Sequence, residues 1–214
     1  MTWLGVCFYA TSSRCGARDT MTGQIETGAL VLVVGPSGAG KDTLIDRARG
    51  HFGRERRLVF ARRMITRASD GVSEDSDSIT PAEFDALEGA GQLLLSWRAH
   101  GLGYAIAGHE RETLQQGKVL VANVSRTVIG DAERRARHVL VVHVTAPINV
   151  LAQRIAARGR EAADDIAARL ARQAPLQTAT ADVIEILNDR DVESAAVQFN
   201  DALAGVMERA RARG

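Results

Sequence analysis

Residues 35–42 read Gly-Pro-Ser-Gly-Ala-Gly-Lys-Asp and directly follow the apolar run 29–34. This order predicts a buried strand, a glycine-rich turn and then a helix. Glycines let the backbone turn tightly, so successive N–H groups point at phosphate oxygens, and a helix starting near Gly40 adds its positive dipole end. Lys41 can reach the outer phosphates as a point charge. The segment predicts a loop for a nucleoside triphosphate, with ATP favoured. The loop residues are Gly35, Pro36, Ser37, Gly38, Ala39, Gly40 and Lys41.

One position departs from the usual loop pattern, G-x-x-x-x-G-K-[ST]. The residue that normally offers a hydroxyl to magnesium is Asp42, and Thr43 follows it. Magnesium favours carboxylate oxygens, so Asp42 can bind it directly or through water, and Thr43 can take part. The sequence leaves these alternatives open. A bound nucleotide at such a loop implies phosphoryl transfer or a motion driven by it.

Composition narrows the class of protein. The chain has 214 residues, 45% hydrophobic and 25% charged, which suits one α/β domain with a core. The formal net charge of +1 gives no reason to expect nucleic-acid binding. No apolar run approaches the roughly 20 residues that span a bilayer, so no membrane association is expected. The sequence does not choose between a monomer and a homodimer.

The first 28 residues differ from the rest, because they are rich in Thr, Ser and Gly and show no period. They lack the basic start and long apolar stretch of a signal peptide, so we expect a poorly ordered extension, with Met21 as an alternative start. Cys7 and Cys15 lie here, without a cluster of ligands, so no cysteine metal site is expected. An ATP-using domain over 29–214 without cysteines fits the cytoplasm.

Apolar runs alternate with helical patterns along the rest of the chain. Several runs are continuous, as in parallel strands covered on both faces. The predicted strands are Leu30–Val34, Leu58–Ala61, Leu93–Trp97, Val119–Val124, Val139–Thr145 and Val183–Leu187. The predicted helices start after Lys41 and at Pro81, and cover Arg111–Gln116, Pro147–Arg158, Ala162–Arg172 and Asp191 to about Arg211.

This alternation predicts an α/β fold with a doubly wound parallel sheet and helices on both faces. Thr80 and Glu83 have the spacing of a capping box at the start of the second helix. The polar segment 66–78 has no period. It is either a solvated loop or the lip of an acceptor site.

These segments, taken in order, resemble the guanylate kinase superfamily over roughly residues 29–205. The resemblance implies a P-loop NTPase fold with a small lid, an acceptor-phosphate arginine at Arg67, and Asn188 near the ATP base. The matching segments are 35–41, 66–67, 95–97, 100–104, 151–161, 166–170 and 188–189.

The departures from that superfamily concern the acceptor. Ser96 stands where guanylate kinases have the Glu that reads guanine, and 67–70 lacks their second acceptor arginine. The strand 119–124 also lacks their acidic end. A site that loses a polar base-reading partner loses strong discrimination, so guanosine monophosphate is a poor candidate acceptor.

A second set of segments is similar to the ribose 1,5-bisphosphate phosphokinases of phosphonate degradation, in which the Asp after the loop lysine is a family feature. These segments are 35–42, 65–67, 96–104, 123–126 and 158–161. The run 121–126 departs from the Asn-Gly-Ser-Arg expected there. The resemblance implies transfer of phosphate from ATP to ribose 1,5-bisphosphate, a small sugar phosphate, giving 5-phosphoribosyl diphosphate.

A phosphate acceptor is already an anion, so no general base is needed, and catalysis reduces to aligning two polyanions and neutralising charge. The resemblance implies that Lys41, Arg158 and Arg160 act on the transferring group. It implies that Arg169 and Arg67 bind phosphate groups. Arg63 is a weaker candidate for this role, because surface arginines are common in this chain.

The ribose and its second phosphate need further contacts. Ser125 and Arg126 follow the strand 119–124, at the edge of the sheet where ligands bind, so we assign them to this role. Tyr104 and His100 join them, although a turn histidine is more often packed or solvated. Two alternatives remain open: a guanylate-type nucleoside monophosphate kinase, and an inactive guanylate-kinase-like binding module.

Overall fold

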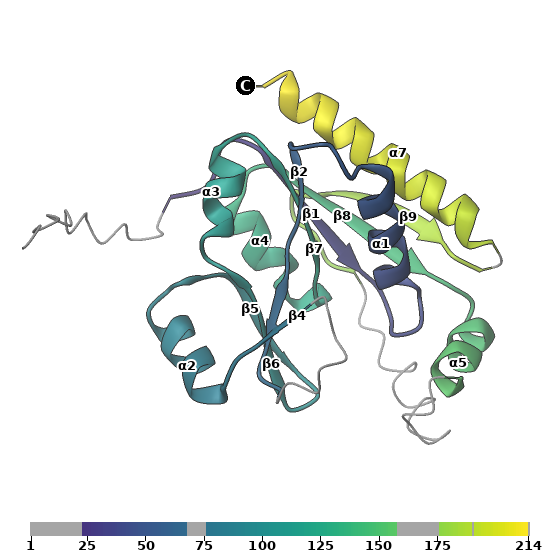
Figure 1. The fold of residues 1–214 in the computed structure, drawn as a ribbon, viewed down its shortest axis with the longest axis horizontal. Coiled ribbons are helices and arrows are strands. Elements are labelled where there is room, and N and C mark those ends of the chain that lie inside the picture. Colours follow the sequence, from purple (N-terminus) through teal and green to yellow (C-terminus); the bar gives the residue numbers. More distant parts are fainter. Residues whose placement is uncertain (1–22, 68–75, 158–175, 190, 214) are drawn as a thin grey trace, which may run out of the picture.

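The computed structural model describes residues 23–67, 76–157, 176–189 and 191–213. A central sheet of five parallel strands has the order β2-β7-β1-β8-β9 (Figure 1). Its strands are β1 (Ala29–Val34), β2 (Leu58–Phe60), β7 (Val119–Asn123), β8 (Val139–Thr145) and β9 (Asp182–Leu187). The predicted parallel sheet is therefore confirmed for five of the six apolar runs.

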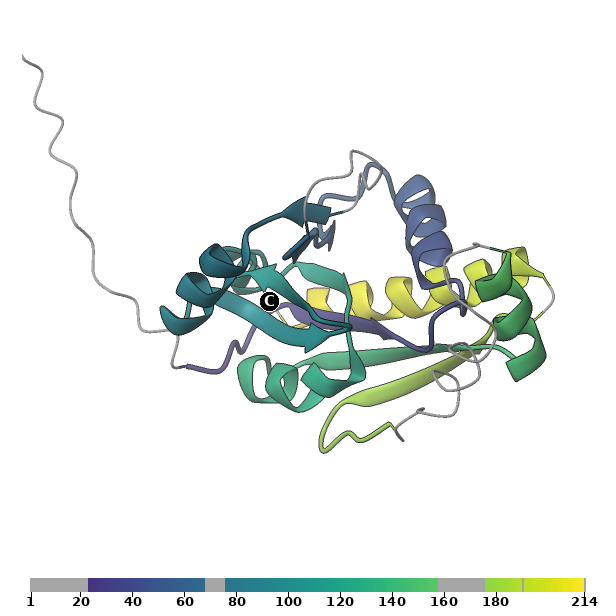
Figure 2. The same ribbon diagram turned by 90° about the horizontal axis from the view of Figure 1, so that it is seen from below.

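Helices cover both faces of the central sheet, because the buried strands present apolar side chains alternately to each side. Val31 and Val33 of β1 pack with α1 (Lys41–His51), α5 (Ile148–Ala156) and α7 (Val192–Arg211). Helices α1 and α7 lie side by side on that face (Figures 1 and 2). Leu30 and Leu32 face the other way, toward α3 (Glu110–Gln115), α4 (Ile129–Arg135) and a second sheet.

The sixth apolar run was placed wrongly in the parallel sheet. It forms β5 (Leu93–Ala99), which pairs antiparallel with β6 (Leu102–Ala107) in a second sheet of order β4-β3-β6-β5. The hairpin turn consists of His100 and Gly101, both with positive φ (53° and 75°), the conformation of a type I′ turn that matches strand twist. The other two strands are β3 (Arg63–Ile65) and β4 (Ser76–Ser78), so the polar segment 66–78 ends in a strand.

Local signals at helix ends were read correctly. Helix α2 (Pro81–Gly89) begins with the predicted capping box: Thr80 Oγ1 accepts from the Glu83 amide at 3.1 Å, and the Glu83 carboxylate accepts from the Thr80 amide at 2.7 Å. Asp191 caps α7 by accepting from two backbone amides. The 3-10 turn η1 (Arg126–Val128) and α4 were not predicted.

One expectation about extent is adjusted by the structure, and another is not tested. Ile25 is buried at 3% exposure and pairs with Ala136 across an isolated bridge, so the packed fold begins before residue 29. The predicted helix 162–172 lies outside the described residues, as does the end of the helix predicted over Pro147–Arg158. None of the helices in the described part of the chain is long and apolar enough to cross a membrane.

Candidate active site

The glycine-rich loop links the end of β1 to the start of α1. Gly38 and Gly40 have φ of 83° and 90°, a region that residues with a Cβ rarely adopt, and Gly40 is the N-cap of α1. The Nζ of Lys41 donates to the carbonyl oxygens of Gly35 and Pro36 at 2.9 and 3.0 Å. The ammonium group therefore lies across the loop, where an anion held by the loop amides would meet it.

Two side chains from distant elements support this loop from outside. Asn188, only 2% exposed at the end of β9, donates from Nδ2 to the Ala39 carbonyl at 2.8 Å. Arg154 of α5 donates to the Asn188 carbonyl at 2.9 Å and to the Gly38 carbonyl at 3.4 Å. Asn188 thus contacts the backbone of the loop, while its role near the ATP base stays a prediction. Arg154 was missed because nothing in this arginine-rich sequence distinguishes it.

Asp42 connects the loop helix to the neighbouring strand and to the second sheet. Its Oδ1 accepts from Asn123 Nδ2 at 2.6 Å, and Arg63 Nη2 of β3 lies 3.7 Å from the same oxygen. Asn123 is buried at the end of β7. The predicted loop residue Asp42 and the predicted phosphate ligand Arg63 are therefore neighbours, although 21 positions separate them in sequence.

This arrangement suits magnesium better than a metal held by protein alone. Within the described ranges, no group of three or more His, Cys, Asp or Glu side chains could enclose an ion. Magnesium typically takes one or two carboxylates and leaves its other positions to water and substrate phosphates. Asp42, whose side chain is 58% exposed, and the adjacent Thr43 hydroxyl offer such a donor set.

We expect the Asp42–Asn123 contact to couple the two elements energetically. In a double-mutant cycle of Asp42→Ala and Asn123→Ala, the coupling free energy of unfolding should be about 0.5–1 kcal/mol, a small value because the carboxylate is partly exposed. Urea unfolding of the four proteins measures it. Glu208→Ala, an exposed carboxylate in the last turn of α7, is the control that should add to Asn123→Ala without coupling. Additivity at Asp42 as well would contradict the contact.

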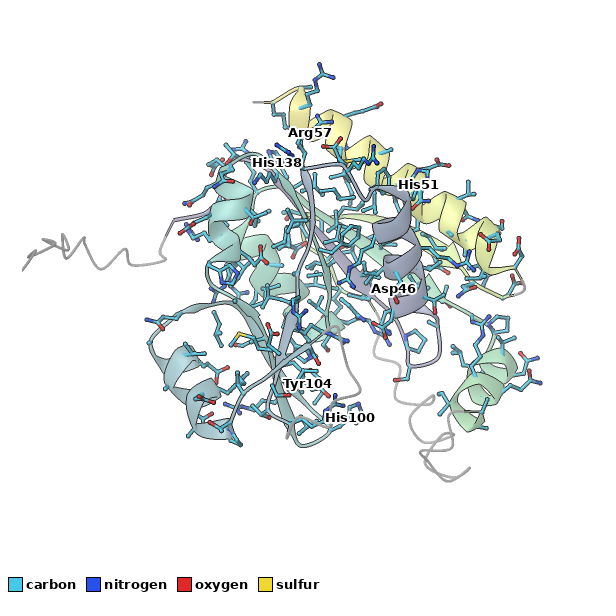
Figure 3. The ribbon with its side chains drawn as sticks, in the orientation of Figure 1. Asp46, His51, Arg57, His100, Tyr104 and His138 are labelled. Atoms are coloured by element: carbon cyan, nitrogen blue, oxygen red, sulfur yellow. The ribbon has the colours of Figure 1, made fainter. Side chains whose placement is uncertain are left out.

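The acceptor candidates of the second sheet form a second group. Thr66 and Gly103 are joined twice: the Thr66 amide donates to the Gly103 carbonyl at 2.9 Å, and the Gly103 amide donates to Thr66 Oγ1 at 2.8 Å. Arg67 follows Thr66, and its amide donates to the Ile65 carbonyl at 2.8 Å. His100 and Tyr104 lie near the far tip of this sheet (Figure 3).

The rest of the hairpin β5–β6 serves packing. The Tyr104 ring stacks on Trp97, with centroids 5.5 Å apart, and Trp97 is 9% exposed. Ser96, at the position of the guanine-reading Glu, donates to Glu88 of α2 at 2.8 Å. Arg98 pairs with the same Glu88 and with Asp85. Ser96 is thus a short side chain engaged with α2.

Ser125 and Arg126 lie where β7 gives way to η1, next to the loop strand β1. Ser125 Oγ accepts from the Thr127 amide at 3.3 Å and so caps η1. Burial lowers the pKa of the Arg126 guanidinium, whose charge therefore lies in a poorly solvated position beside the sheet edge.

A separate groove of about 1940 Å³ among α2, α3 and α4 is lined by none of the predicted site residues.

The structure therefore assembles two groups at one end of the sheet: the loop with Asp42, Thr43 and Asn188, and the acceptor candidates of the second sheet and η1. The three remaining candidates, Arg158, Arg160 and Arg169, lie outside the described residues.

Comparison with known proteins identifies the family of this chain. The chain is 49% identical over 172 residues to a ribose 1,5-bisphosphate phosphokinase of Methylobacterium radiotolerans, an alignment that covers 80% of this chain and 95% of that protein. The chain belongs to the ribose 1,5-bisphosphate phosphokinase family. A Brucella melitensis protein of the same family is 43% identical over 80% of this chain and 90% of the relative. No protein-family model matches the chain.

Some relatives of this kinase family are longer. A bifunctional ribose 1,5-bisphosphokinase-thymidine phosphorylase of Cupriavidus pinatubonensis is 48% identical over 83% of this chain, and the chain spans 29% of that protein's length. Among solved structures, guanylate kinase from Anaplasma phagocytophilum matches with a TM-score of 0.59 and 16% identity, over 84% of this chain and 86% of the other. That similarity shows that the chain has the P-loop NTPase fold.

Proposed function

We propose that this protein transfers the γ-phosphoryl group of ATP to ribose 1,5-bisphosphate, giving ADP and 5-phosphoribosyl 1-diphosphate, as a cytoplasmic step of phosphonate degradation. The observation that carries the proposal is the 49% identity to a phosphokinase of that name over nearly its full length. The engagement of Ser96 with Glu88 supports it, because a guanylate-type acceptor would need a base-reading group there.

The donor side of the mechanism follows from the loop. Backbone amides of the glycine-rich turn and the ammonium of Lys41 bind the outer phosphates of ATP and hold them in line for transfer. Asp42 and Thr43 would hold magnesium, which supplies neutralisation of the charge on the transferring group. Asn188 and Arg154 fix the loop backbone, so the amides keep their direction during turnover.

The acceptor side needs cations and no general base, because the attacking group is itself a phosphate. We assign Arg67 to an acceptor phosphate, with Arg63 linking that side to Asp42. Arg126 and Ser125, with Tyr104 and His100, would hold the ribose and its second phosphate. The lid arginines Arg158 and Arg160, with Arg169, would close over the transferring group, where planar guanidinium groups pair with phosphate oxygens.

The deciding experiment measures coupled ADP release by the purified protein with ATP and magnesium, comparing ribose 1,5-bisphosphate with guanosine monophosphate. We expect turnover on the ribose bisphosphate alone. Turnover on guanosine monophosphate would identify a nucleotide kinase with an unusual base site. ATP binding without turnover on either acceptor would favour a binding module and would overturn the proposal.

A further inference from the structure

His143 is a partly buried residue that the mechanism above does not use. It lies near the carboxyl end of β8, where side chains alternate between the two faces of the sheet. Val142 and Val144 pack on the side of α1 and α7, whereas Val141 packs on the side of the second sheet. His143 has the parity of Val141, so its ring faces the second sheet and η1, the side that carries the acceptor candidates.

The same point of β8 adjoins the phosphate-binding loop. His143 is in register with Val34, the last residue of β1 before the loop. The loop's first glycine lies so close to β8 that a Cβ on Gly35 would be 2.0 Å from the Val144 carbonyl oxygen. His143 therefore lies within one residue of the place where the loop begins.

The two ring nitrogens of His143 have different surroundings. Nδ1 lies 3.7 Å from Glu185 Oε2 on the neighbouring strand β9. Nε2 is buried and has no hydrogen-bond partner among the described residues. A buried polar atom without a partner costs about 1–3 kcal/mol, so native proteins rarely retain one unless a ligand or water uses it. The side chain as a whole is 18% exposed, so the ring reaches the surface although Nε2 itself is buried.

The charges around the ring define what that ligand should be. Burial is the main cause that lowers the pKa of His143, and the cations Arg126 of η1 and Lys41 of α1 lower it further, while Glu185 raises it. On the neighbouring strand β1, the residue in register with His143 is Val34, whose side chain carries no titratable group. The ring is therefore neutral at pH 7. A bound anion would offset the charge of the nearby cations and raise the pKa of the ring.

We propose that His143 is an acceptor-binding residue, whose Nε2–H donates a hydrogen bond to a phosphate oxygen of the sugar bisphosphate while Glu185 orients the ring through Nδ1. With Nδ1–H toward Glu185, neutral imidazole presents a lone pair at Nε2, which would repel a phosphate oxygen. Binding of the phosphate therefore draws one proton from solvent onto Nε2. The inference rests on the proposed function, since that function supplies the bisphosphate.

The test follows the five histidines of the whole protein by NMR, each titrated in the free protein, with ribose 1,5-bisphosphate, and with ADP. We expect the bisphosphate to raise the pKa of His143 by about one unit or more. His138 is the internal control, because burial also lowers its pKa. It lies five residues away on the same strand segment, roughly 16 Å at the usual rise, and far from His100 and Tyr104 (Figure 3).

Three variants distinguish a role of His143 in binding the bisphosphate from a general loss of folding. His143→Leu should raise the KM for the bisphosphate about tenfold, the loss of roughly one hydrogen bond to a charged group, with the KM for ATP unchanged. His143→Gln keeps an N–H near the same place and should restore most of the affinity. Glu185→Gln should lower the pKa of His143 further, because it removes the one anionic neighbour that raises it.

Two outcomes would overturn the inference. If the bisphosphate is turned over while the pKa of His143 stays fixed, the inference fails and the proposed function stands. If calorimetry detects no binding of the bisphosphate, the proposed function fails and takes the inference with it. A pKa that rises with ADP alone would also refute the assignment to the acceptor, because it would place His143 at the donor phosphates.

Discussion

Replacing Lys41 with Met should reduce kcat by about 10³-fold or more, the scale of losing one preorganised group that stabilises charge in the transition state. Lys41 Nζ reaches across the loop to two backbone carbonyls, and its part-buried position makes its charge more effective than on the surface. Methionine has similar length and apolar volume, so the helix α1 should form normally. Initial rates of ADP release at saturating ATP and bisphosphate measure the effect.

The chain offers a matched control for this variant. Only two lysines occur in the sequence, and the other is Lys118, which lies just before β7 at the opposite end of the sheet from the loop. Lys118 is partly buried, and Lys118→Met should leave kcat within about twofold, because substitutions away from a site usually have small effects. Retained turnover in Lys41→Met would mean that phosphoryl transfer does not pass through this loop.

The parts of the fold that sequence predicts well are those set by local physics. The strand Val139–Thr145 is found with its exact bounds, since a mostly apolar run of this length, interrupted only by His143, has few alternatives. The capping box at Thr80 is found because its two hydrogen bonds join residues three positions apart. The loop 35–42 is found for the same reason, as its chemistry is contiguous in sequence.

The second sheet was missed because its signals are non-local or weak. Two of its strands, β3 and β4, are only three residues long, and β6 carries a glycine that weakens any strand pattern. The turn at His100 lacks the usual Asn-Gly signal, so the run 93–97 was read as another parallel strand. The apolar pattern of β5 alone cannot tell a parallel partner from an antiparallel one.

The candidate site residues also divide into those with local sequence signals and those without. Lys41, Asp42 and Arg67 were predicted from motifs, whereas Arg154 and His143 draw attention only through their neighbours from distant parts of the chain. His143 has the sequence neighbourhood of a buried strand, and only the register of β1, β8 and β9 brings it beside the loop and Glu185. Asp42 was expected at magnesium, yet its contact with Asn123, 81 positions away, depends on where β7 ends.

Gly35→Ala should abolish nucleotide binding and destabilise the whole domain. The added Cβ would lie 2.0 Å from the Val144 carbonyl oxygen, and Gly35 has φ of 149°, where side chains are strained. Backbone strain of this kind costs about 1–3 kcal/mol before any clash is counted. Because the clash is with the backbone of a central strand, neither rotamer change nor side-chain movement can relieve it. The loop must therefore move away from β8, and its amides lose their common direction.

Gly50→Ala is the matched control, because this glycine lies in the exposed part of α1 and an added Cβ would meet nothing within 4 Å. It should stabilise the protein by about 0.5–1 kcal/mol, the usual gain from alanine inside a helix, and leave ADP affinity unchanged. Urea unfolding and calorimetric titration with ADP measure both variants. If Gly35→Ala bound ADP like the parent protein, close packing of the loop on β8 could not be what holds the amides in place.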